Sequence, residues 1–326
     1  MDRRTFIALL TGTWVFEPPS LGAQQVGTIS TIGVLVAATQ PTPTILGNIA
    51  AMRAALRDLG WVEGNNLVVE TRWAGENPQR QREIAADLKA LPVALIVAPG
   101  TITIRAARDG APDLPVIMIA AGDAVGAGFV ASLARPGGNL TGTTAAGEEV
   151  LAKQLELLSL VVPALKRVSV LMNSANPANG FFFDAMSSRA KNLGLRLDRI
   201  EVSTEGELDQ AMMRAKGGAL LVVGDPMFGR NHARIADLAL RSGLPAIFGG
   251  RFYVAAGGLM SYLSSDTWHW RTAATLIDKV LKGAKPADIP VQQPTQYELI
   301  INLKTAKALG LSIPAALLLR ADEVIQ

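Results

Sequence analysis

The sequence predicts a two-lobed α/β protein in which each Rossmann-like lobe is built on a parallel sheet. From residue 31 onward, short apolar runs alternate with amphipathic stretches of helical period, which is the pattern of repeated strand–helix units. The pattern pauses at 139–143, which we expect to be a connecting segment, and restarts at Glu149. The length of 326 residues exceeds that of a typical single domain and favours two domains.

The expected elements follow from the apolar runs and from the helical spacing between them. Strands are expected at 32–36, 67–72, 93–98 and 116–120 in the first half, and at 168–172, 195–202, 219–223 and 245–248 in the second. Helices are expected at 45–59, 78–90, 101–108, 149–160, 178–193, 207–214 and 231–241.

The last part of the chain does not simply extend the second lobe. A strand at 259–262 and a helix at 267–281 are followed by a polar, proline-containing stretch at 285–294 and another strand at 297–302. A chain that builds one lobe, then the other, and then returns and crosses again predicts a hinge made of several segments.

Residues 1–23 have the order of a secretory signal peptide. Arg3 and Arg4 precede an apolar run to Phe16, prolines interrupt it, and small residues lead to an expected cleavage site after Ala23. The paired arginines also resemble a twin-arginine signal. The apolar run is too short to span a bilayer, so we expect a free, periplasmic protein. The alternative is a buried N-terminal helix.

Composition excludes several classes of site. There are no cysteines and only two histidines, so thiolate chemistry and His-rich metal sites are excluded. The net charge of +3 comes from basic residues scattered among acids, which argues against nucleic acid as a partner. The motifs of P-loops, dinucleotide-binding turns and nucleophile elbows are absent, so we expect neither cofactor, metal nor enzyme activity. An enzyme on a similar two-lobe scaffold remains the alternative from another class.

Candidate ligand-binding residues follow the strands, because ligands of open parallel sheets bind beyond the carboxyl ends of the strands. A Gly-Asp pair recurs there in each half, and the two aspartates could grip an ammonium group from both sides. Thr39 and Thr101 could hold a carboxylate, and Phe228 could form an apolar wall. The expected ligand-binding residues are Ala38, Thr39, Gln40, Gly100, Thr101, Asp123, Asn176, Asn179, Asp225, Phe228 and Arg251.

Several of the residues near the strand ends and helix starts also have a purely structural interpretation. An aspartate after a strand commonly caps the next helix, and Arg251 could bridge the lobes. At most two of Phe181, Phe182 and Phe183 can face a cleft, because they are consecutive in a helix. The cluster at 268–270 is expected to pack in a core or on a lobe surface, and His232 is expected at a solvated helix start.

Ordered blocks along the chain resemble the substrate-binding proteins of ABC transporters, in particular their TrpX-like branch. The N-terminal stretches 3–10 and 23–25 are similar to the signal segment of that family. The other blocks are LGWVEGNN at 59–66, GDAVGAG at 122–128, SLARPGGNLTG at 132–142, ANPAN at 175–179, RIADLA at 234–239, GGLMSY at 257–262 and NLKTAKALGL at 302–311.

This resemblance implies a type I periplasmic-binding-protein fold with three crossovers between the lobes. It places lobe 1 at 24–143 plus about 263–292 and lobe 2 at 144–262 plus about 293–326. It implies a monomeric receptor that delivers a small molecule to an ABC permease, with a sensor for a membrane receptor as the alternative. Loop 37–44, the stretch 143–146 and the phenylalanine triplet depart from the family pattern. The ligand therefore stays open among aromatic amino acids, other amino acids and related carboxylates.

Overall fold

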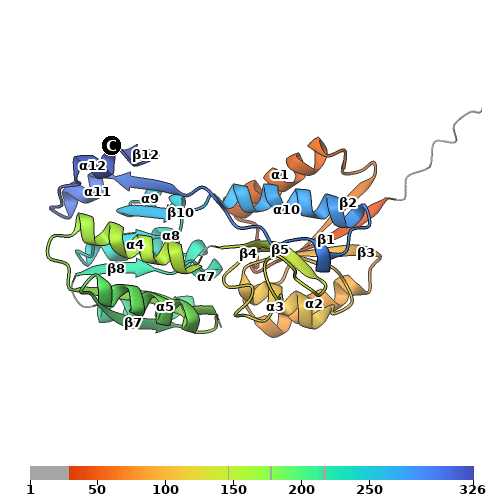
Figure 1. Cartoon of the computed structure of the whole chain (residues 1–326), viewed down its shortest axis with the longest axis horizontal. Helices are drawn as coiled ribbons and strands as arrows, with labels where there is room; N and C mark the ends of the chain where they lie inside the picture. The colour runs from red at the N-terminus through yellow and green to blue at the C-terminus, as the bar shows by residue number, and fades with distance from the viewer. Residues whose placement is uncertain (1–28, 146, 177, 216–217) are drawn as a thin grey trace, which may run out of the picture.

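Two α/β lobes lie side by side in the computed structural model, which describes residues 29–145, 147–176, 178–215 and 218–326 (Figure 1). Lobe 1 holds a five-stranded parallel sheet in the order β2-β1-β3-β4-β5. Its strands are β1 (Ser30–Val36), β2 (Leu67–Trp73), β3 (Val93–Pro99), β4 (Val116–Ala121) and β5 (Leu140–Thr144). The expected signal peptide at 1–23 lies outside the described residues.

Lobe 2 holds a seven-stranded sheet in the order β12-β11-β10-β9-β8-β6-β7. All its neighbouring strands are parallel except β10 and β11, which pair antiparallel. Its strands are β6 (Arg167–Asn173), β7 (Arg196–Val202), β8 (Ala219–Val222), β9 (Ala246–Phe248), β10 (Met260–Leu263), β11 (Glu298–Asn302) and β12 (Glu323–Ile325).

Helices cover both faces of the lobe 1 sheet, because alternate residues of its strands point to opposite faces. In β1, Ile32, Val34 and Val36 join the core under α1 (Pro43–Asp58) and α10 (Asp266–Leu281). Leu35 joins the core under α2 (Pro78–Lys89) and α3 (Thr101–Gly110). Figure 1 shows α1 and α10 lying together although they are far apart in the sequence.

The helices of lobe 2 enclose two further cores of the same kind. They are α4 (Gly147–Val161), α5 (Ala178–Asn192), α6 (Leu208–Arg214), α7 (Pro226–Arg230), α8 (His232–Arg241), α9 (Arg251–Ala255), α11 (Leu303–Ala308) and α12 (Ala315–Leu318). None of the helices in the described part of the chain combines the length and the apolar character that a membrane span needs.

The chain passes between the lobes after β5, after β10 and before β11. The last passage runs beside the first: Gln292 accepts a hydrogen bond from the Thr144 N–H at 3.0 Å, and its own N–H donates to Gly142 O at 2.8 Å. Helix α10 therefore belongs to the core of lobe 1 although it follows a strand of lobe 2. The prediction of two α/β lobes is confirmed, and the chain's passages make the hinge.

The prediction that 139–143 merely connects the lobes is wrong, because this stretch forms β5 at the edge of the lobe 1 sheet. Its threonines are buried, and Thr141 Oγ1 donates to Ile289 O at 2.7 Å. Hydrogen bonds of this kind allow polar side chains to be buried. A strand with buried threonines is therefore overlooked when strands are predicted from apolar runs. The short elements α7, α9, α11, α12 and β12 were also not expected.

Gly142 allows β5 to lie close to β4, and this gives a test of the sheet. Its φ is 151°, and an added Cβ would overlap the backbone of Met118. We expect Gly142→Ala to lower the free energy of unfolding by about 2 kcal/mol or more, as overpacked cores do. Gly138→Ala is the control, because an added Cβ there meets open space. Urea unfolding measures both, and equal midpoints for the two variants would contradict this account of β5.

Candidate functional site

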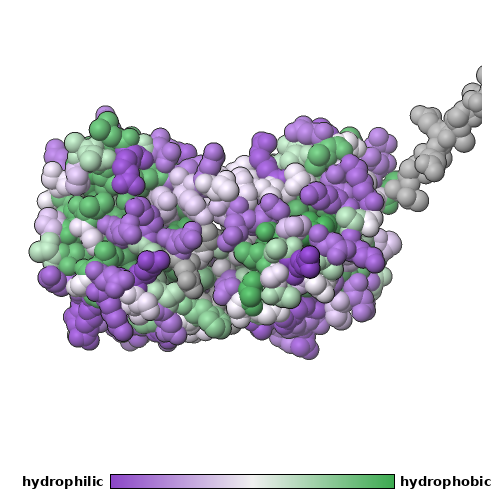
Figure 2. All heavy atoms as spheres, viewed as in Figure 1, coloured by the Kyte–Doolittle hydropathy of each residue, from purple (hydrophilic) through white to green (hydrophobic). Residues whose placement is uncertain are grey.

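A cavity of about 650 Å³ lies between the lobes, where the carboxyl ends of the central strands face each other. Figure 2 shows hydrophilic and hydrophobic areas interspersed over both lobes and a waist where the lobes meet. The lining comes from the residues after β1, β3 and β4 in lobe 1, from those after β8 and β9 in lobe 2, and from α4, α5 and α10. Both lobes therefore contribute to one site.

Helix α3 begins at the cavity. Its N-cap residue is Gly100, with a φ of 79°, and no side chain in the described part of the chain caps the helix. Thr101 Oγ1 accepts a hydrogen bond from the Gly122 N–H at 3.0 Å, so its own hydroxyl proton remains to be donated. The first N–H groups of a helix have no partner within the helix, and they favour an anion. This end of the cavity is suited to a carboxylate.

Asp225 lies opposite, at the N-cap of α7. Its Oδ1 accepts hydrogen bonds from the Met227 N–H at 2.9 Å and from Asn173 Nδ2 at 3.0 Å, and its Oδ2 accepts from Asn176 Nδ2 at 3.1 Å. Burial raises the pKa of the Asp225 carboxyl, and the two asparagine amides and the Met227 N–H oppose that rise. A carboxylate has about four acceptor positions, so Oδ2 can accept one more donor from the cavity.

The two lobes meet beside these groups. An added Cβ at Gly100 would lie 3.0 Å from Pro226 Cγ, so the start of α3 is in near contact with the residue that follows Asp225. This contact brings an uncapped helix N-terminus and a buried carboxyl to neighbouring positions on opposite walls. The pair is complementary to adjacent negative and positive groups on one small molecule.

Arg230, at the end of α7, joins the lobes directly. Its Nη1 donates to Ala37 O at 2.6 Å, and its Nη2 forms an ion pair with Glu76. Burial lowers the pKa of the Arg230 guanidinium to about 10, which leaves it charged at neutral pH. These contacts cross the mouth of the cavity, so the structure is a closed arrangement of the lobes.

His269 connects two of the hinge segments. Its ring is 2 % exposed, Nε2 lies 2.9 Å from Ser264 Oγ after β10, and Nδ1 lies 3.0 Å from Thr143 Oγ1 in β5. Thr143 Oγ1 also accepts the N–H of Ala120, which has a φ of 50° and lines the cavity. Backbone in this region costs about 1 kcal/mol or more, so this network fixes a strained part of the wall.

Apolar side chains form the part of the lining nearest the hinge. Val150 and Leu151 come from the first turns of α4, Phe182 from α5, Leu263 from the end of β10, and Trp270 from α10. All but Leu263 are buried, and the residues come from both lobes. Such walls accommodate an apolar group, and the few polar groups of the lining fix its orientation.

A family model described as ABC transporter substrate binding protein matches residues 32–325. The chain belongs to this family. The chain is also 29 % identical over 259 residues to a tyrosine-binding protein of Clostridioides difficile. The aligned region covers 79 % of this chain and 74 % of that protein.

Two solved structures show the same fold. The crystal structure of an ABC domain in complex with L-Trp from Streptococcus pneumonia has a TM-score of 0.84 at 25 % identity and covers 91 % of this chain and all of that chain. The ligand-free, open structure of a substrate binding protein with adhesive properties from Clostridium difficile has a TM-score of 0.67 at 24 % identity with the same coverage. The predicted type I periplasmic-binding-protein fold and TrpX-like resemblance are confirmed.

Four of the residues expected to bind ligand line the cavity of this family member, namely Gly100, Thr101, Asn176 and Asp225. They come from one strand end in lobe 1 and two in lobe 2. Ala38 is buried beside the lining residue Ala37, whereas Thr39 and Gln40 are exposed beyond it.

The structure does not place the remaining expected residues in the lining. Asp123 Oδ1 accepts the Gly126 N–H at 2.8 Å and closes its own turn, so this structure does not bring the two aspartates together in the lining. Phe228 is fully buried in a core of lobe 2. Arg251 forms an ion pair with Glu323 at 2.7 Å. Asn179 is buried and donates to Asn173 O at 2.7 Å.

Sequence reasoning missed most of the α4 side of the cavity. Gly147, Val150, Leu151 and Gln154 are spaced by three, four and seven, so they share one helix face. That spacing is visible in the sequence, but a buried helix face has the same spacing whether it packs against a core or against a ligand. Similarly, His232, His269 and Trp270 line the cavity, where core packing or a solvated position was expected.

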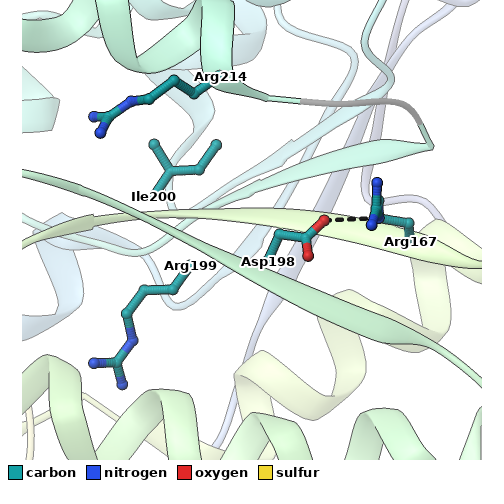
Figure 3. A pocket seen from close by; sticks show the side chains of 5 residues that line it. All are labelled: Arg167, Asp198, Arg199, Ile200 and Arg214. Carbon is teal, nitrogen blue, oxygen red and sulfur yellow. Dashed lines mark ion pairs between the residues drawn. The ribbon is translucent and has the colours of Figure 1, made fainter.

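A second, smaller pocket of about 190 Å³ lies on lobe 2 and is lined by Arg167, Asp198, Arg199, Ile200 and Arg214 (Figure 3). Asp198 pairs with Arg167 at 2.8 Å, and Arg199 lies 4.3 Å from the ring centre of Phe183. Figure 3 shows the guanidinium groups of Arg199 and Arg214 on opposite sides of the strand that carries Arg199. These charged groups do not converge on one point. In the part of the chain that the structure describes, no group of three or more His, Asp or Glu residues could hold a metal ion.

The buried ring of His269 predicts a pH dependence of stability. Burial lowers the pKa of His269 from 6.5 to about 4, so the unfolded chain takes up a proton between these values before the folded protein does. The contribution of the neutral ring to the free energy of unfolding is therefore fully present above pH 6.5. It falls by about 3 kcal/mol as the pH falls towards 4. Asp225 has a raised pKa and gives the opposite slope.

The difference between the wild type and His269→Gln isolates this contribution, because the slope from Asp225 is common to both proteins. We expect the variant to be less stable at pH 7, since it loses hydrogen bonds to Thr143 and Ser264, and the gap to shrink as the pH falls. Urea unfolding between pH 4 and 8 measures it. A gap that is constant over this range would show that the ring titrates alike in the folded and unfolded states.

Proposed function

We propose that this protein is a monomeric, exported receptor of an ABC importer that captures an α-amino acid as its zwitterion between the two lobes. Membership of the family supports the transport role and an inner-membrane permease as partner. Binding then proceeds without chemistry on the ligand. The basic and apolar order of residues 1–23 supports export through a cleaved signal peptide.

The observation that carries the ligand class is the charge balance of the cavity. Among the described lining residues, the only carboxylate is Asp225 and the only guanidinium is Arg230. The start of α3 adds backbone N–H groups beside Asp225. A ligand with one ammonium and one carboxylate on the same carbon matches this arrangement in charge, and the start of α3 and Asp225 lie close enough to be reached by one small molecule.

In this proposal the ammonium group donates to the open position of Asp225 Oδ2, and the carboxylate accepts from the start of α3 and from the Thr101 hydroxyl. A positive group beside Asp225 favours its ionised form and offsets the effect of burial on its pKa. The side chain of the ligand then points towards Val150, Phe182 and Trp270. The tyrosine-binding relative and the L-Trp complex of a similar structure support an aromatic amino acid.

Closure of the lobes would signal to the permease that a ligand is bound. The contacts of Arg230 with Ala37 and Glu76 form between the lobes and hold the cavity shut. A ligand that touches both α3 and Asp225 stabilises the same closed form, so it shifts the population of the lobes towards closure. The permease then recognises the closed shape.

Binding of a zwitterion is tested by isothermal titration with L-tryptophan, L-tyrosine and L-phenylalanine, and with analogues that lack one charged group. We expect at least one amino acid to bind, and its desamino and decarboxylated analogues to bind at least tenfold more weakly, because each leaves one charged group of the site unmatched. A desamino acid that binds as well as its parent would overturn the role of Asp225 and leave a carboxylate receptor.

The anchor role of Asp225 has a matched control in the chain. Asp225→Asn keeps an acceptor for the Met227 N–H but removes the charge, so we expect the Kd to rise about 10- to 100-fold. Asp123→Asn removes the charge of a carboxylate that closes a turn outside the cavity lining, and we expect its Kd to be unchanged. Titration of both variants measures this, and equal Kd values for the two would contradict the anchor role.

A further inference from the structure

One polar atom at the hinge end of the cavity has no hydrogen-bond partner among the described residues. Gln154 lines the cavity on the same face of α4 as Val150 and Leu151, and it is 2 % exposed. Its Oε1 is buried and accepts no hydrogen bond from any residue that the structure describes. A buried amide oxygen of this kind lacks the donor that water would otherwise provide.

The orientation of the Gln154 amide is fixed by its other end. Nε2 donates to Tyr262 O at 2.8 Å, and a carbonyl oxygen can only accept, so the nitrogen must face β10. If the amide were turned over, Oε1 would lie against Tyr262 O, and two acceptors would face each other. The free end of the amide is an acceptor.

The polar neighbours in this part of the lining do not supply the missing donor. Both ring nitrogens of His269 are already within hydrogen-bond distance of Ser264 and Thr143. The other lining residues around Gln154 include Val150, Leu151 and Leu263, which have no polar side-chain atoms. A donor carried on the ligand would satisfy the oxygen.

We propose that Gln154 determines specificity by accepting a hydrogen bond from an N–H or O–H group on the side chain of the ligand. The inference rests on the proposed function, which places the amino-acid head group at α3 and Asp225 and directs the side chain towards the hinge. Gln154 then selects aromatic side chains with a donor at the edge, such as an indole N–H or a phenol O–H, over hydrocarbon rings of similar size. Because Oε1 is covered in this structure, the proposal requires the neighbouring lining side chains to move when the donor binds.

Gln81 in α2 shows what the same pattern does away from the cavity. It is 1 % exposed, its Nε2 donates to Gly75 O at 2.8 Å, and its Oε1 also has no partner among the described residues. Gln81 does not line the cavity, so no ligand can reach it there. The position of Gln154 in the lining, and not its unsatisfied oxygen alone, distinguishes the two. Gln81 is thus a matched control.

The test compares two pairs of probes that differ in one donor: L-tyrosine with L-phenylalanine, and L-tryptophan with 3-benzothienyl-L-alanine, in which sulfur replaces the indole N–H. Titration of the purified protein is expected to show at least a fivefold preference for the donor-bearing member of a pair. In Gln154→Met this preference is expected to fall below twofold, and in Gln81→Met it is expected to stay as in the wild type.

The ratio within a pair is the readout because any structural damage from losing the bond to Tyr262 O affects both probes alike. A preference that persists in Gln154→Met overturns the role of Gln154, as does a wild type that binds the probes with no preference. The second result needs no variant, so it decides the question even if Gln154→Met does not fold. A wild type that binds none of the four probes refutes the proposed aromatic amino-acid ligand, and the role of Gln154 with it.

Discussion

The parallel arrangement of the strands is the constraint on which the site depends. Parallel strands end at the same edge of a sheet, so the loops and helix starts that follow β1, β3 and β4 gather at one edge of lobe 1. Those that follow β8 and β9 gather likewise in lobe 2. Because the chain crosses between the lobes beside these edges, the two sets of helix starts face each other across one cavity.

Two sets of contacts fix the arrangement of the lobes, one between the lobes at the mouth of the cavity and one among the hinge segments. At the mouth, Arg230 forms a charged contact with Glu76 and a hydrogen bond with Ala37, which partly exposed groups can exchange for water. At the hinge, His269 joins Thr143 and Ser264 in a fully buried network. Opening therefore breaks contacts at the mouth, whereas the buried hinge network has no water to replace its hydrogen bonds and is suited to stay intact.

The two Gly-Asp pairs show why similar sequence need not give similar function. Asp225 is followed by a proline that starts α7, and the carboxyl is enclosed by Asn173 and Asn176 from the neighbouring loop. Asp123 is followed by a glycine-containing turn, which its side chain closes by accepting the Gly126 N–H. The local motif set each aspartate at a strand end. The residues that neighbouring strands and loops place around each aspartate decided whether its carboxyl lines the cavity.

The sequence by itself determined the two α/β lobes, the returning helix, expected at 267–281 and found at 266–281, and the strand ends that carry Thr101, Asn176 and Asp225. The apolar period of each segment, and the order of the segments along the chain, are visible in the sequence itself. The tertiary structure alone decided that β5 is a strand, since its threonines are satisfied by distant partners such as Ile289 O. It also decided that Gln154, His269 and Trp270 line the cavity. A buried helix face has the same periodicity against a core as against a ligand, so only the packing of the two lobes could distinguish them.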